Sequence, residues 1–440
     1  MRFLYDLIFI CFSFAYLPFF LMRLKQAESK KRLLAERCGF LSGAIQPDTR
    51  AVRLWIHAVS VGEVLTIRVL IDELKKKIPQ AAVFVSVVTP TGFSVAKKQL
   101  APDMVIFYLP FDLSWITDRV MARIAPRALV LVETELWPNL IAAADKKKVP
   151  VCIVNGRLSP RSFKRYHAFR HVLKPMIDKI ACVTVQNECY RERFVALGFS
   201  AGRVTVTGTM KFDVLAGRNE PLTSALRQAW SERCGFPQGA FIFMAASTHA
   251  PEEQYCLAAY RALREKNPAA RLVIAPRHIN RTPAIIDDIE KNTLRWRCAD
   301  EAAVAGKQSV PQEADVFVLN TIGELAAWYR FCDLVFVGGS LIPHGGQNPL
   351  EAAVCGCPII TGNAYHNFPD IYDVLRERGG VVVVDSPEQL RTTVGLLSGD
   401  AGKRRAMGEI AAAFIAERCG ASAKNAARIQ ALLSEDTTVL

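Results

Sequence analysis

The chain has 440 residues, which is long for one domain and comfortable for two with separate hydrophobic cores. Its composition is 51% hydrophobic and 22% charged, and the absence of a repeat of fixed period argues against solenoids and propellers. The formal net charge of +13 indicates an anionic partner, and nucleic acid, an anionic membrane surface and a phosphorylated substrate all satisfy it.

The 12 cysteines do not have the spacing of a metal site. None forms a CxxC pair and no HExxH sequence occurs, so no zinc site is expected. Several, including Cys152, Cys182 and Cys332, lie in or beside apolar strand-like runs. Such placement is typical of buried free thiols and fits a reducing compartment.

An apolar segment opens the chain. Phe3 to Met22 is apolar apart from Asp6, Ser13 and several aromatic residues, and as a helix it would span roughly the 30 Å of a bilayer core. Basic residues follow at once: Arg23, Lys25, Lys30, Lys31, Arg32 and Arg37. This flank favours an uncleaved anchor with the remaining chain on the cytoplasmic side. We therefore expect residues 1–22 to form a membrane anchor, and Asp6 and Pro18 leave open whether it spans the bilayer or lies in one leaflet.

Short apolar runs then alternate with segments of helical period, such as Gly62–Ile78 and Thr134–Lys148. The runs are Val52–Ala58, Ala82–Val88, Met104–Leu109, Ala128–Val132, Val151–Val154, Cys182–Gln186 and Val204–Thr207. Their continuous apolarity and β-branched residues indicate parallel strands buried on both faces. Strands that alternate with helices predict a doubly wound, Rossmann-like α/β domain over residues 23–215.

A more polar stretch, Phe212 to Phe236, interrupts this alternation, and a second series of strands follows. Its members are Phe241–Ala245, Leu272–Ala275, Val316–Leu319, Leu334–Val337, Pro358–Thr361 and Gly380–Val384. We predict a second Rossmann-like domain over residues 216–440, with a helical, Ala-rich end after Ser386. Two such domains facing a cleft would place the strand carboxyl ends, and hence the ligands, in that cleft.

The first candidate site is His57-Ala-Val-Ser60-Val-Gly62-Glu63, where an apolar strand turns into a helix. Ser60 and Glu63 have the spacing of a capping box, which is a structural explanation for both residues. The functional interpretation makes Glu63 a general base at a strand end, as sugar transfer to a hydroxyl requires. Gly62 would let a substrate approach the backbone. Both interpretations remain open at this point.

The second candidate site, Glu133-Thr-Glu135-Leu-Trp137-Pro-Asn139, follows the strand Ala128–Val132. Two carboxylates beside a tryptophan indicate a site, although a solvated helix start explains them equally. The third candidate is Lys211, which follows a glycine turn at the end of the first domain. There it would face a phosphate or a developing charge, or serve only as a hinge residue.

A basic region extends from Lys146 to Lys179, with ten Lys or Arg residues against one acid, Asp178. Phe163, Tyr166 and Phe169 are interleaved with the basic residues. This pattern fits a surface that lies on a membrane or binds phosphates, and it fits a merely solvated face equally well.

Turns with polar or glycine residues follow successive strands of the second domain. They are Ser247–His249, Ala275–His278, Thr321–Glu324 and Gly338–Ser340, and the loop Gly345–Glu351 comes next. Thr321 with Glu324 and Asn348 with Glu351 have capping-box spacing, and Pro349 suits a first helical position. Helix amides exposed to a glycine loop suit a nucleotide phosphate, so these turns predict a nucleotide pocket. No Asp-x-Asp pair follows a strand, so a metal-bridged diphosphate donor is not indicated, and Arg277 with helix amides would hold a single phosphate.

At these residues the sequence resembles the 3-deoxy-D-manno-octulosonic acid (Kdo) transferases of lipopolysaccharide synthesis. The matching segments are His57–Glu63, Thr89–Gly92, Tyr108–Asp112, Glu133–Asn139, Asn155–Ser159, Thr207–Asp213, Ser247–His249, Pro276–His278, Gly323–Leu325 and Gly338–Ala353. They run in order from about residue 50 to 370, whereas the chain beyond about residue 385 has little signature. His344 departs from the pattern.

The resemblance implies a GT-B fold, CMP-Kdo as donor and a lipid A precursor as acceptor at the cytoplasmic face of a bacterial inner membrane. By similarity, Glu63 would be the base, and Glu133 and Lys211 would stabilise the transition state. The residues that would hold CMP are Pro276, Arg277, Ile322, Gly323, Glu324, Asn348, Pro349, Leu350 and Glu351. No metal, cofactor or nucleic acid is expected. A single displacement with one base and a cationic phosphate clamp suits this chemistry.

Two other functions compete with this one. Another GT-B enzyme, such as an N-acetylglucosamine transferase acting on a lipid-linked acceptor, would keep the fold and change both substrates. Competition by CMP or by UDP separates the two. A membrane-tethered basic module without catalysis would explain the basic region but would leave the ordered strand-end motifs without a purpose.

Overall fold

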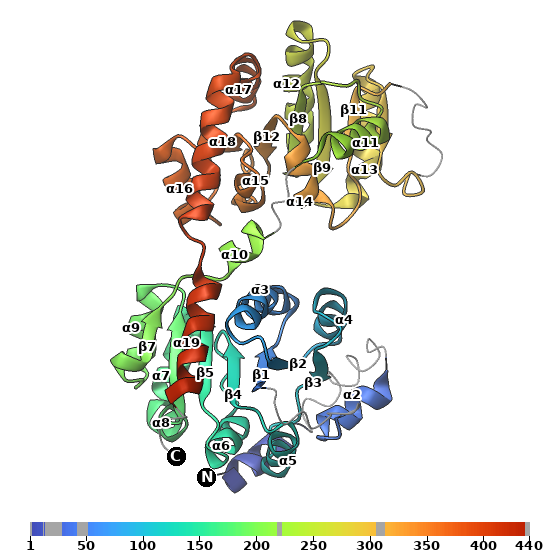
Figure 1. Ribbon diagram of the computed structural model, residues 1–440. Coiled ribbons are helices and arrows are strands. Elements are labelled where there is room, and N and C mark those ends of the chain that lie inside the picture. The colour runs from blue at the N-terminus through green and yellow to red at the C-terminus, as the bar shows by residue number, and fades with distance from the viewer. Residues whose placement is uncertain are drawn as a thin grey trace. The chain divides into compact units, whose positions relative to one another are not determined.

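The computed structural model describes residues 2–11, 13, 29–41, 52–217, 222–304 and 313–435. The chain divides into two compact units. Unit 1 comprises Met1–Val214 together with Arg418–Leu440, and unit 2 comprises Leu215–Glu417. Each unit is an α/β domain built on a parallel sheet, so the predicted fold class is confirmed (Figure 1).

Unit 1 contains a 7-stranded sheet in the order β3-β2-β1-β4-β5-β6-β7. The strands are β1 (Val52–Ala58), β2 (Ala81–Val87), β3 (Val105–Tyr108), β4 (Ala128–Val132), β5 (Val151–Gly156), β6 (Ile180–Val185) and β7 (Val204–Val206). Side chains alternate between two cores, with Leu54 and Ile56 in one and Trp55 and Leu129 in the other. Burial on both faces explains why these strands are continuous apolar runs.

Helices cover both faces of this sheet. They are a helical segment over residues 2–11, α2 (Lys30–Arg37), α3 (Val61–Lys77), α4 (Pro90–Gln99), α5 (Ser114–Ile124), α6 (Pro138–Lys146), α7 (Pro160–Ala168), α8 (Arg170–Ile177), α9 (Glu188–Ala196) and α19 (Ala421–Glu435). The helix α10 (Lys211–Ala216) contains the boundary between the two units. Several helices begin at the capping residue that the sequence supplies: Ser60 accepts from the Glu63 amide, and Thr89 accepts from the Gly92 amide.

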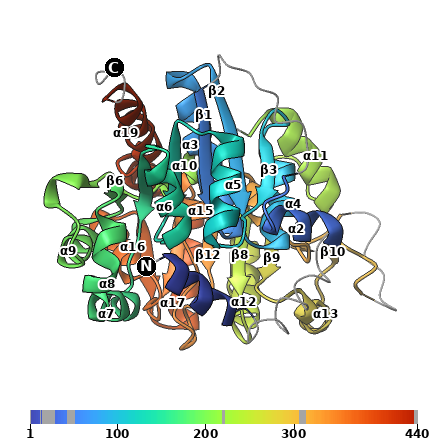
Figure 2. The ribbon, with the colours of Figure 1, turned by 90° about the horizontal axis from the view of Figure 1, so that it is seen from below.

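The last helix does not belong to the domain in which its sequence position places it. We predicted one domain over residues 216–440, but α19 packs against α3 in unit 1 and buries Ala421, Ala426 and Ile429 in the core there. In both ribbon views it lies among the elements of unit 1, although its colour marks the end of the chain (Figure 1, Figure 2). An Ala-rich amphipathic helix fits any apolar surface, so its sequence does not indicate which core it completes.

Unit 2 contains a second 7-stranded parallel sheet in the order β10-β11-β9-β8-β12-β13-β14. Its strands are β8 (Ile242–Thr248), β9 (Arg271–Pro276), β10 (Trp296–Cys298), β11 (Val316–Val318), β12 (Leu334–Val337), β13 (Ile359–Gly362) and β14 (Val381–Val384). The helices are α11 (Ser224–Cys234), α12 (Glu252–Lys266), α13 (Thr282–Lys291), α14 (Leu325–Trp328), α15 (Leu350–Val354), α16 (Pro369–Arg378), α17 (Pro387–Gly399) and α18 (Ala401–Ala416). Phe243, Leu272 and Phe336 are buried in its core.

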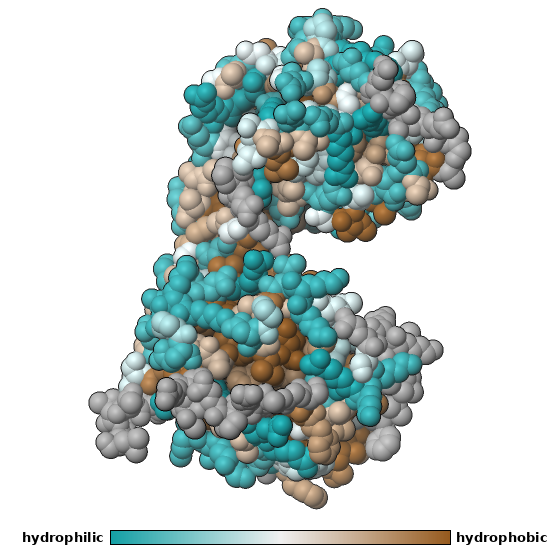
Figure 3. Space-filling model, turned by 45° about the vertical axis from the view of Figure 1, so that its right-hand side comes forward, coloured by the Kyte–Doolittle hydropathy of each residue, from teal (hydrophilic) through white to brown (hydrophobic). Residues whose placement is uncertain are grey.

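The first part of the expected membrane anchor is a short helix attached to unit 1. Residues 2–11 are helical, and residues 14–22 of the predicted anchor lie outside the described part of the chain. Asp6 is buried, whereas Phe3, Leu4, Leu7 and Ile8 are exposed. Within the described ranges, no helix combines the length and apolarity needed to cross a bilayer. On the face drawn in Figure 3, hydrophilic side chains predominate and hydrophobic ones gather in separate patches.

Candidate active site

The order in which the chain adds strands to the sheet of unit 1 reverses between β1 and β4. From β1, the chain adds β2 and β3 on one side, and it then returns to add β4 on the other side. Ligands of doubly wound sheets bind beyond the carboxyl ends of the strands at such a switch point. The two motifs that follow β1 and β4 carry Glu63, Glu133 and Glu135, so the topology places these three carboxylates at the expected site.

Glu63 is the third residue of α3, and both of its oxygens accept hydrogen bonds. Oε2 accepts from the backbone amide of Val59 at 2.8 Å, and Oε1 accepts from Oγ of Ser60 at 2.7 Å. Ser60 in turn accepts from the Glu63 amide. Ser60 therefore caps the helix as its spacing predicts, whereas the carboxylate of Glu63 reaches the amide of Val59 in place of that of Ser60, so the predicted capping box is present in part. Because each carboxylate oxygen has two lone pairs, these bonds fix the side chain and leave it able to accept another proton.

Glu133 lies directly after β4 in a left-handed backbone conformation, with φ of +59°. A residue with a Cβ seldom adopts this conformation, and it is concentrated at functional sites. The Glu133 amide donates to the carbonyl of Val154 on β5 at 2.9 Å, which holds the turn against the sheet. Burial raises the pKa of this carboxyl, the negative charge of Glu63 raises it further, and the positive charge of Arg157 opposes both.

Glu135 belongs to the same motif, but we did not assign it a role from sequence. Its Oε2 accepts a hydrogen bond from Nε1 of Trp137 at 3.1 Å. Burial is the main cause that raises its pKa to about 7, and the charge of Glu63 adds to the effect. A carboxyl with this pKa exchanges protons at neutral pH, which is a property of general acids and bases. Arg157, the cation whose charge acts on Glu133, lies in the predicted basic region, and we did not assign it a role at this site from sequence.

Lys211 is exposed at the start of α10, and the backbone around it is tied to the same sheet edge. The amide of Met210, its neighbour, donates to Oδ1 of Asn155 at 3.2 Å. Asn155 lies at the end of β5 with φ of +56°. It directly follows Val154, the partner of the Glu133 amide. This connection places the lysine backbone near the turn that carries Glu133.

The sheet of unit 2 has its switch point between β8 and β12. The turn after β12, Gly338–Ser340, is one of the turns that predicted a nucleotide pocket, and in the structure its amides are bonded within the protein. The buried carboxylate of Glu252 already accepts hydrogen bonds from the amides of Gly339 and Ser340, at 2.7 and 2.9 Å. It also accepts from the amides of Leu341 and His249. The Glu252 carboxylate therefore stabilises this turn, and the amides bonded to it are not available to a phosphate.

Two further candidate segments of unit 2, at Pro276–Arg277 and Asn348–Glu351, contain an exposed cation and a helix start. Pro276 ends β9, and the exposed Arg277 follows with its amide bonded to the carbonyl of Thr248 on β8. Asn348 accepts a hydrogen bond from the amide of Leu350 at 3.2 Å. The sequence predicted Pro349 as the first helical residue. In the structure α15 begins at Leu350, so Pro349 is its cap residue. A shallow pocket lined by Leu215, Ala326, Arg330, Glu351, Val354 and Cys355 lies against this helix.

Glu324 differs from the prediction that it closes a capping box with Thr321. The helix α14 begins after it, at Leu325, and Glu324 forms an ion pair with Arg233 at 2.7 Å. The pairing with Arg233 lowers the pKa of Glu324. In the same turn, Ile322 is 86% exposed and Gly323 has φ of +93°. The turn thus presents an exposed backbone at a strand end, as a ligand-binding loop requires.

Three histidines gather at the same sheet edge. The ring of His249 lies 5.4 Å from that of His278 and 4.2 Å from that of His344. Burial lowers the pKa of His249, and the neighbouring His344 lowers it further. His344, which departs from the family pattern, thus joins two histidines that belong to it. Among the residues that the structure describes, no group of three or more His, Cys, Asp or Glu side chains is arranged to hold a metal ion.

The basic region folds into α7 and α8 on the surface of unit 1. α7 has no buried residue, and its basic side chains Arg161, Lys164 and Arg165 are exposed. Phe169, between the two helices, is 65% exposed, and Val172 is 64% exposed. Exposed apolar side chains among basic ones distinguish this face from an ordinary solvated helix.

Comparisons with known proteins agree with this architecture. Residues 32–214 match the family described as 3-deoxy-D-manno-octulosonic-acid transferase (kdotransferase). The chain is 33% identical over 425 residues to the 3-deoxy-D-manno-octulosonic acid transferase of Haemophilus influenzae, with 96% of each chain covered. It is 30% identical over 409 residues to that of Bordetella pertussis, covering 91% of this chain and 92% of the relative. Among solved structures, the UDP-GlcNAc 2-epimerase of Neisseria meningitidis has the same fold, with a TM-score of 0.57 at 13% identity over 87% of this chain and 100% of that one.

Proposed function

The chain belongs to the 3-deoxy-D-manno-octulosonic acid transferase family and is a glycosyltransferase, and we propose that it transfers Kdo from CMP-Kdo to a lipid A precursor, lipid IVA. The observation that carries the proposal is the position of Glu63, Glu133 and Glu135 at the switch point of unit 1. Full-length similarity to Kdo transferases supplies the sugar, and the strand-end carboxylates supply the chemistry of transfer to a hydroxyl.

The reaction is a direct displacement at the anomeric carbon of Kdo. Glu63 takes the proton of the acceptor hydroxyl as that oxygen attacks, and the bond to the CMP phosphate breaks. Positive charge develops on the sugar and negative charge on the phosphate, so charged groups fixed in place stabilise the transition state. Glu133 stabilises the positive charge on the sugar, and Lys211 stabilises the negative charge on the phosphate. The two hydrogen bonds on Glu63 hold the base in one orientation.

Unit 2 holds CMP at the turns that follow its strands. Arg277 contributes a cation to the phosphate, and Pro276 shapes the turn around it. The exposed backbone of Ile322 and Gly323, with Glu324 fixed by Arg233, and the segment from Asn348 to Glu351 bind the remainder of the nucleotide. The transfer requires no metal and no cofactor, because Arg277 and backbone amides neutralise a single phosphate.

The acceptor is a lipid, and we place the enzyme at the cytoplasmic face of a bacterial inner membrane. The basic and apolar surface of α7 and α8 suits an anionic membrane, since each exposed lysine or arginine adds attraction and Phe169 inserts into the interface. The same surface suits an acceptor that carries phosphates. No nucleic acid takes part.

The test is transfer with purified protein in detergent, CMP-Kdo and lipid IVA, followed by mass spectrometry of the lipid. We expect the lipid to gain the mass of one or more Kdo units, with and without EDTA. Glu63→Ala should abolish the gain, whereas Glu192→Ala, an exposed glutamate of α9, should not. Competition by UDP instead of CMP would identify a different donor, and loss of activity in EDTA would contradict metal independence.

A further inference from the structure

Two neighbouring helices of unit 1, α5 and α6, begin without a cap of their own. The cap residue of α5 is Leu113 and that of α6 is Trp137, and neither makes a side-chain cap hydrogen bond. The first amides of a helix have no partner within the helix and need an acceptor from elsewhere. Both helices receive one from a distant carboxylate.

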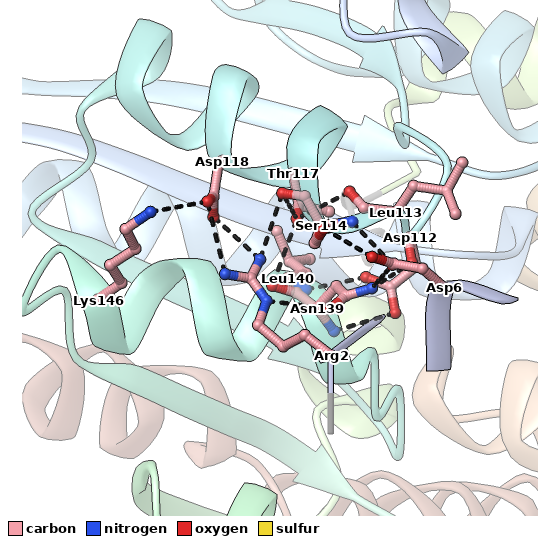
Figure 4. Close-up of polar contacts among 10 residues, drawn as sticks. All are labelled: Arg2, Asp6, Asp112, Leu113, Ser114, Thr117, Asp118, Asn139, Leu140 and Lys146. Carbon is pink, nitrogen blue, oxygen red and sulfur yellow. Dashed lines mark hydrogen bonds and ion pairs between the residues drawn. The ribbon is translucent and has the colours of Figure 1, made fainter. Parts of the chain in front are cut away.

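Asp6, from the N-terminal helix, caps α5. Its Oδ1 accepts from the amide of Ser114 at 3.0 Å, and its Oδ2 accepts from the Ser114 hydroxyl at 2.6 Å. Asp112 caps α6: its oxygens accept from the amides of Asn139 and Leu140, at 3.2 and 2.8 Å. Figure 4 shows the two carboxylates lying side by side at the starts of the two helices.

Asn139 joins the two caps. Its Nδ2 donates to Oδ1 of Asp6 at 2.7 Å and to the carbonyl of Asp112 at 2.8 Å. Its Oδ1 accepts from Nε of Arg2 at 3.1 Å. Asp6, Asp112 and Asn139 are 5%, 2% and 1% exposed, so this network is buried, and removing one member leaves buried polar groups without one of their partners.

The network explains the two charges in an otherwise apolar segment. Arg2 and Asp6 are four residues apart and therefore lie on one face of the helix. That face is attached to unit 1, and Arg2 also forms an ion pair with Asp118 at 3.0 Å (Figure 4). A nonpolar contact, Phe9 against Phe111 with ring centroids 6.5 Å apart, adds to it.

The start of α6, to which Asp6 and Asp112 are bonded, lies next to the candidate catalytic turn. Residues 133–137 connect β4 to α6, and one end of this turn is fixed by the bond from Glu133 to Val154. The other end is Trp137, the cap residue of α6, whose indole holds Glu135. Asn139 is two residues further on, so the bonds of Asp6 and Asp112 to Asn139 and Leu140 fix this second end.

We propose that Asp6 is a positioning residue, through which the N-terminal helix holds the turn 133–137, with Glu133 and Glu135, in its working geometry. The helix is thus part of the construction of the active site in addition to any attachment to a membrane. The kinetic part of this inference rests on the proposed function.

The test compares Asp6→Ala with Asp103→Ala, which removes an exposed carboxylate of unit 1 that pairs with Lys75. Transfer is measured in detergent, so attachment to a membrane does not contribute. We expect Asp6→Ala to lower kcat roughly ten- to a hundredfold, as displacement of a catalytic group does, and to shift the pH profile of kcat. The affinity for CMP, which unit 2 binds, should not change. Asp6→Asn keeps an acceptor for the Ser114 amide, so its kcat should lie between those of Asp6→Ala and Asp103→Ala.

A wild-type kcat and pH profile in Asp6→Ala would overturn the proposal and leave the helix as an attachment alone. Hydrogen exchange of amides 133–146 gives a second decision that needs no turnover. Faster exchange there in Asp6→Ala, but not in Asp103→Ala, supports positioning, and equal exchange overturns it. If the wild-type chain transferred no Kdo, the proposed function would fall, and the exchange result would still decide this inference.

Discussion

The indole Nε1–H of Trp137 donates a 3.1 Å hydrogen bond to Oε2 of Glu135 within the same turn. The bond favours the ionised carboxyl, but burial and the charges of Glu63 and Glu133 outweigh it, so the pKa of Glu135 rises to about 7. Glu135 is therefore divided between its two protonation states at neutral pH. It gives the site a carboxyl that both donates and accepts protons under physiological conditions.

This pKa predicts how stability depends on pH. A carboxyl whose pKa is higher in the folded state than its usual 4.5 binds more protons when folded, so its contribution to stability is present below pH 4.5 and is lost as the pH rises through about 7. A glutamine does not titrate, so the stability of Glu135→Gln does not include this pH-dependent loss. The difference in urea midpoint, variant minus wild type, should therefore grow in favour of the variant between pH 5 and pH 8. Equal differences at both pH values would contradict the raised pKa.

Arg277→Ala should weaken CMP binding about ten- to a hundredfold, because a charged hydrogen bond to phosphate contributes about 1.5–3 kcal/mol. Calorimetric titration of CMP measures this directly. Arg391→Ala is the matched control, since Arg391 is an arginine of the same unit that forms an exposed ion pair with Glu388. An unchanged affinity in Arg277→Ala would remove this residue from the nucleotide site.

Asp213 fastens the last helix to unit 1. Its two oxygens accept from the amides of Gly420 and Ser422, at 2.5 and 2.6 Å, and so cap the start of α19. Replacement by Ala should lower the free energy of unfolding by about 1–2 kcal/mol, as loss of a capping side chain does. Asp213→Asn, which keeps an acceptor, should lose less. Urea unfolding followed by circular dichroism distinguishes them, and equal stability of all three chains would refute the cap.

Two helical glycines should respond to alanine in opposite directions. A Cβ on Gly408 of α18 would lie 2.0 Å from the carbonyl oxygen of Gly356, so Gly408→Ala should cost about 1–3 kcal/mol as α18 moves away. Gly395 of α17 has open space around it, so Gly395→Ala should add about 0.4–1 kcal/mol by restricting the unfolded chain. Thermal unfolding of the two variants checks the pair. An unchanged or raised melting temperature in Gly408→Ala would show that the approach of α18 to Gly356 is not tight, and a lowered one in Gly395→Ala would show that the space around Gly395 is not open.

The strands could be predicted from sequence where burial on both faces of the sheet requires a continuous run of apolar residues. Strands Val52–Ala58 and Ala128–Val132 have the boundaries that we predicted. β10 was missed because three residues, Trp296–Cys298, are too few to show a period and include an arginine. The position of α19 was missed because contacts between distant parts of the chain decide it.

The site was predictable only in part for the same reason. The pairing of Ser60 with Glu63 is local, and the spacing of the two residues was sufficient to predict it. The groups that fill the turn after β12 and pair with Glu324 come from far along the chain: Glu252 is 87 residues from Gly339, and Arg233 is 91 residues from Glu324. Spacing cannot reveal such partners.

The return of α19 to unit 1 has a consequence for the order in which the protein is made. Unit 2 is an insertion within unit 1, because Leu215–Glu417 separates two segments of one core. A ribosome completes the whole of unit 2 before it releases Ala426 and Ile429, which unit 1 buries. During synthesis, the half of the protein that begins first is therefore the half that finishes last. A chain truncated near residue 417 would have a complete second domain and an incomplete first one.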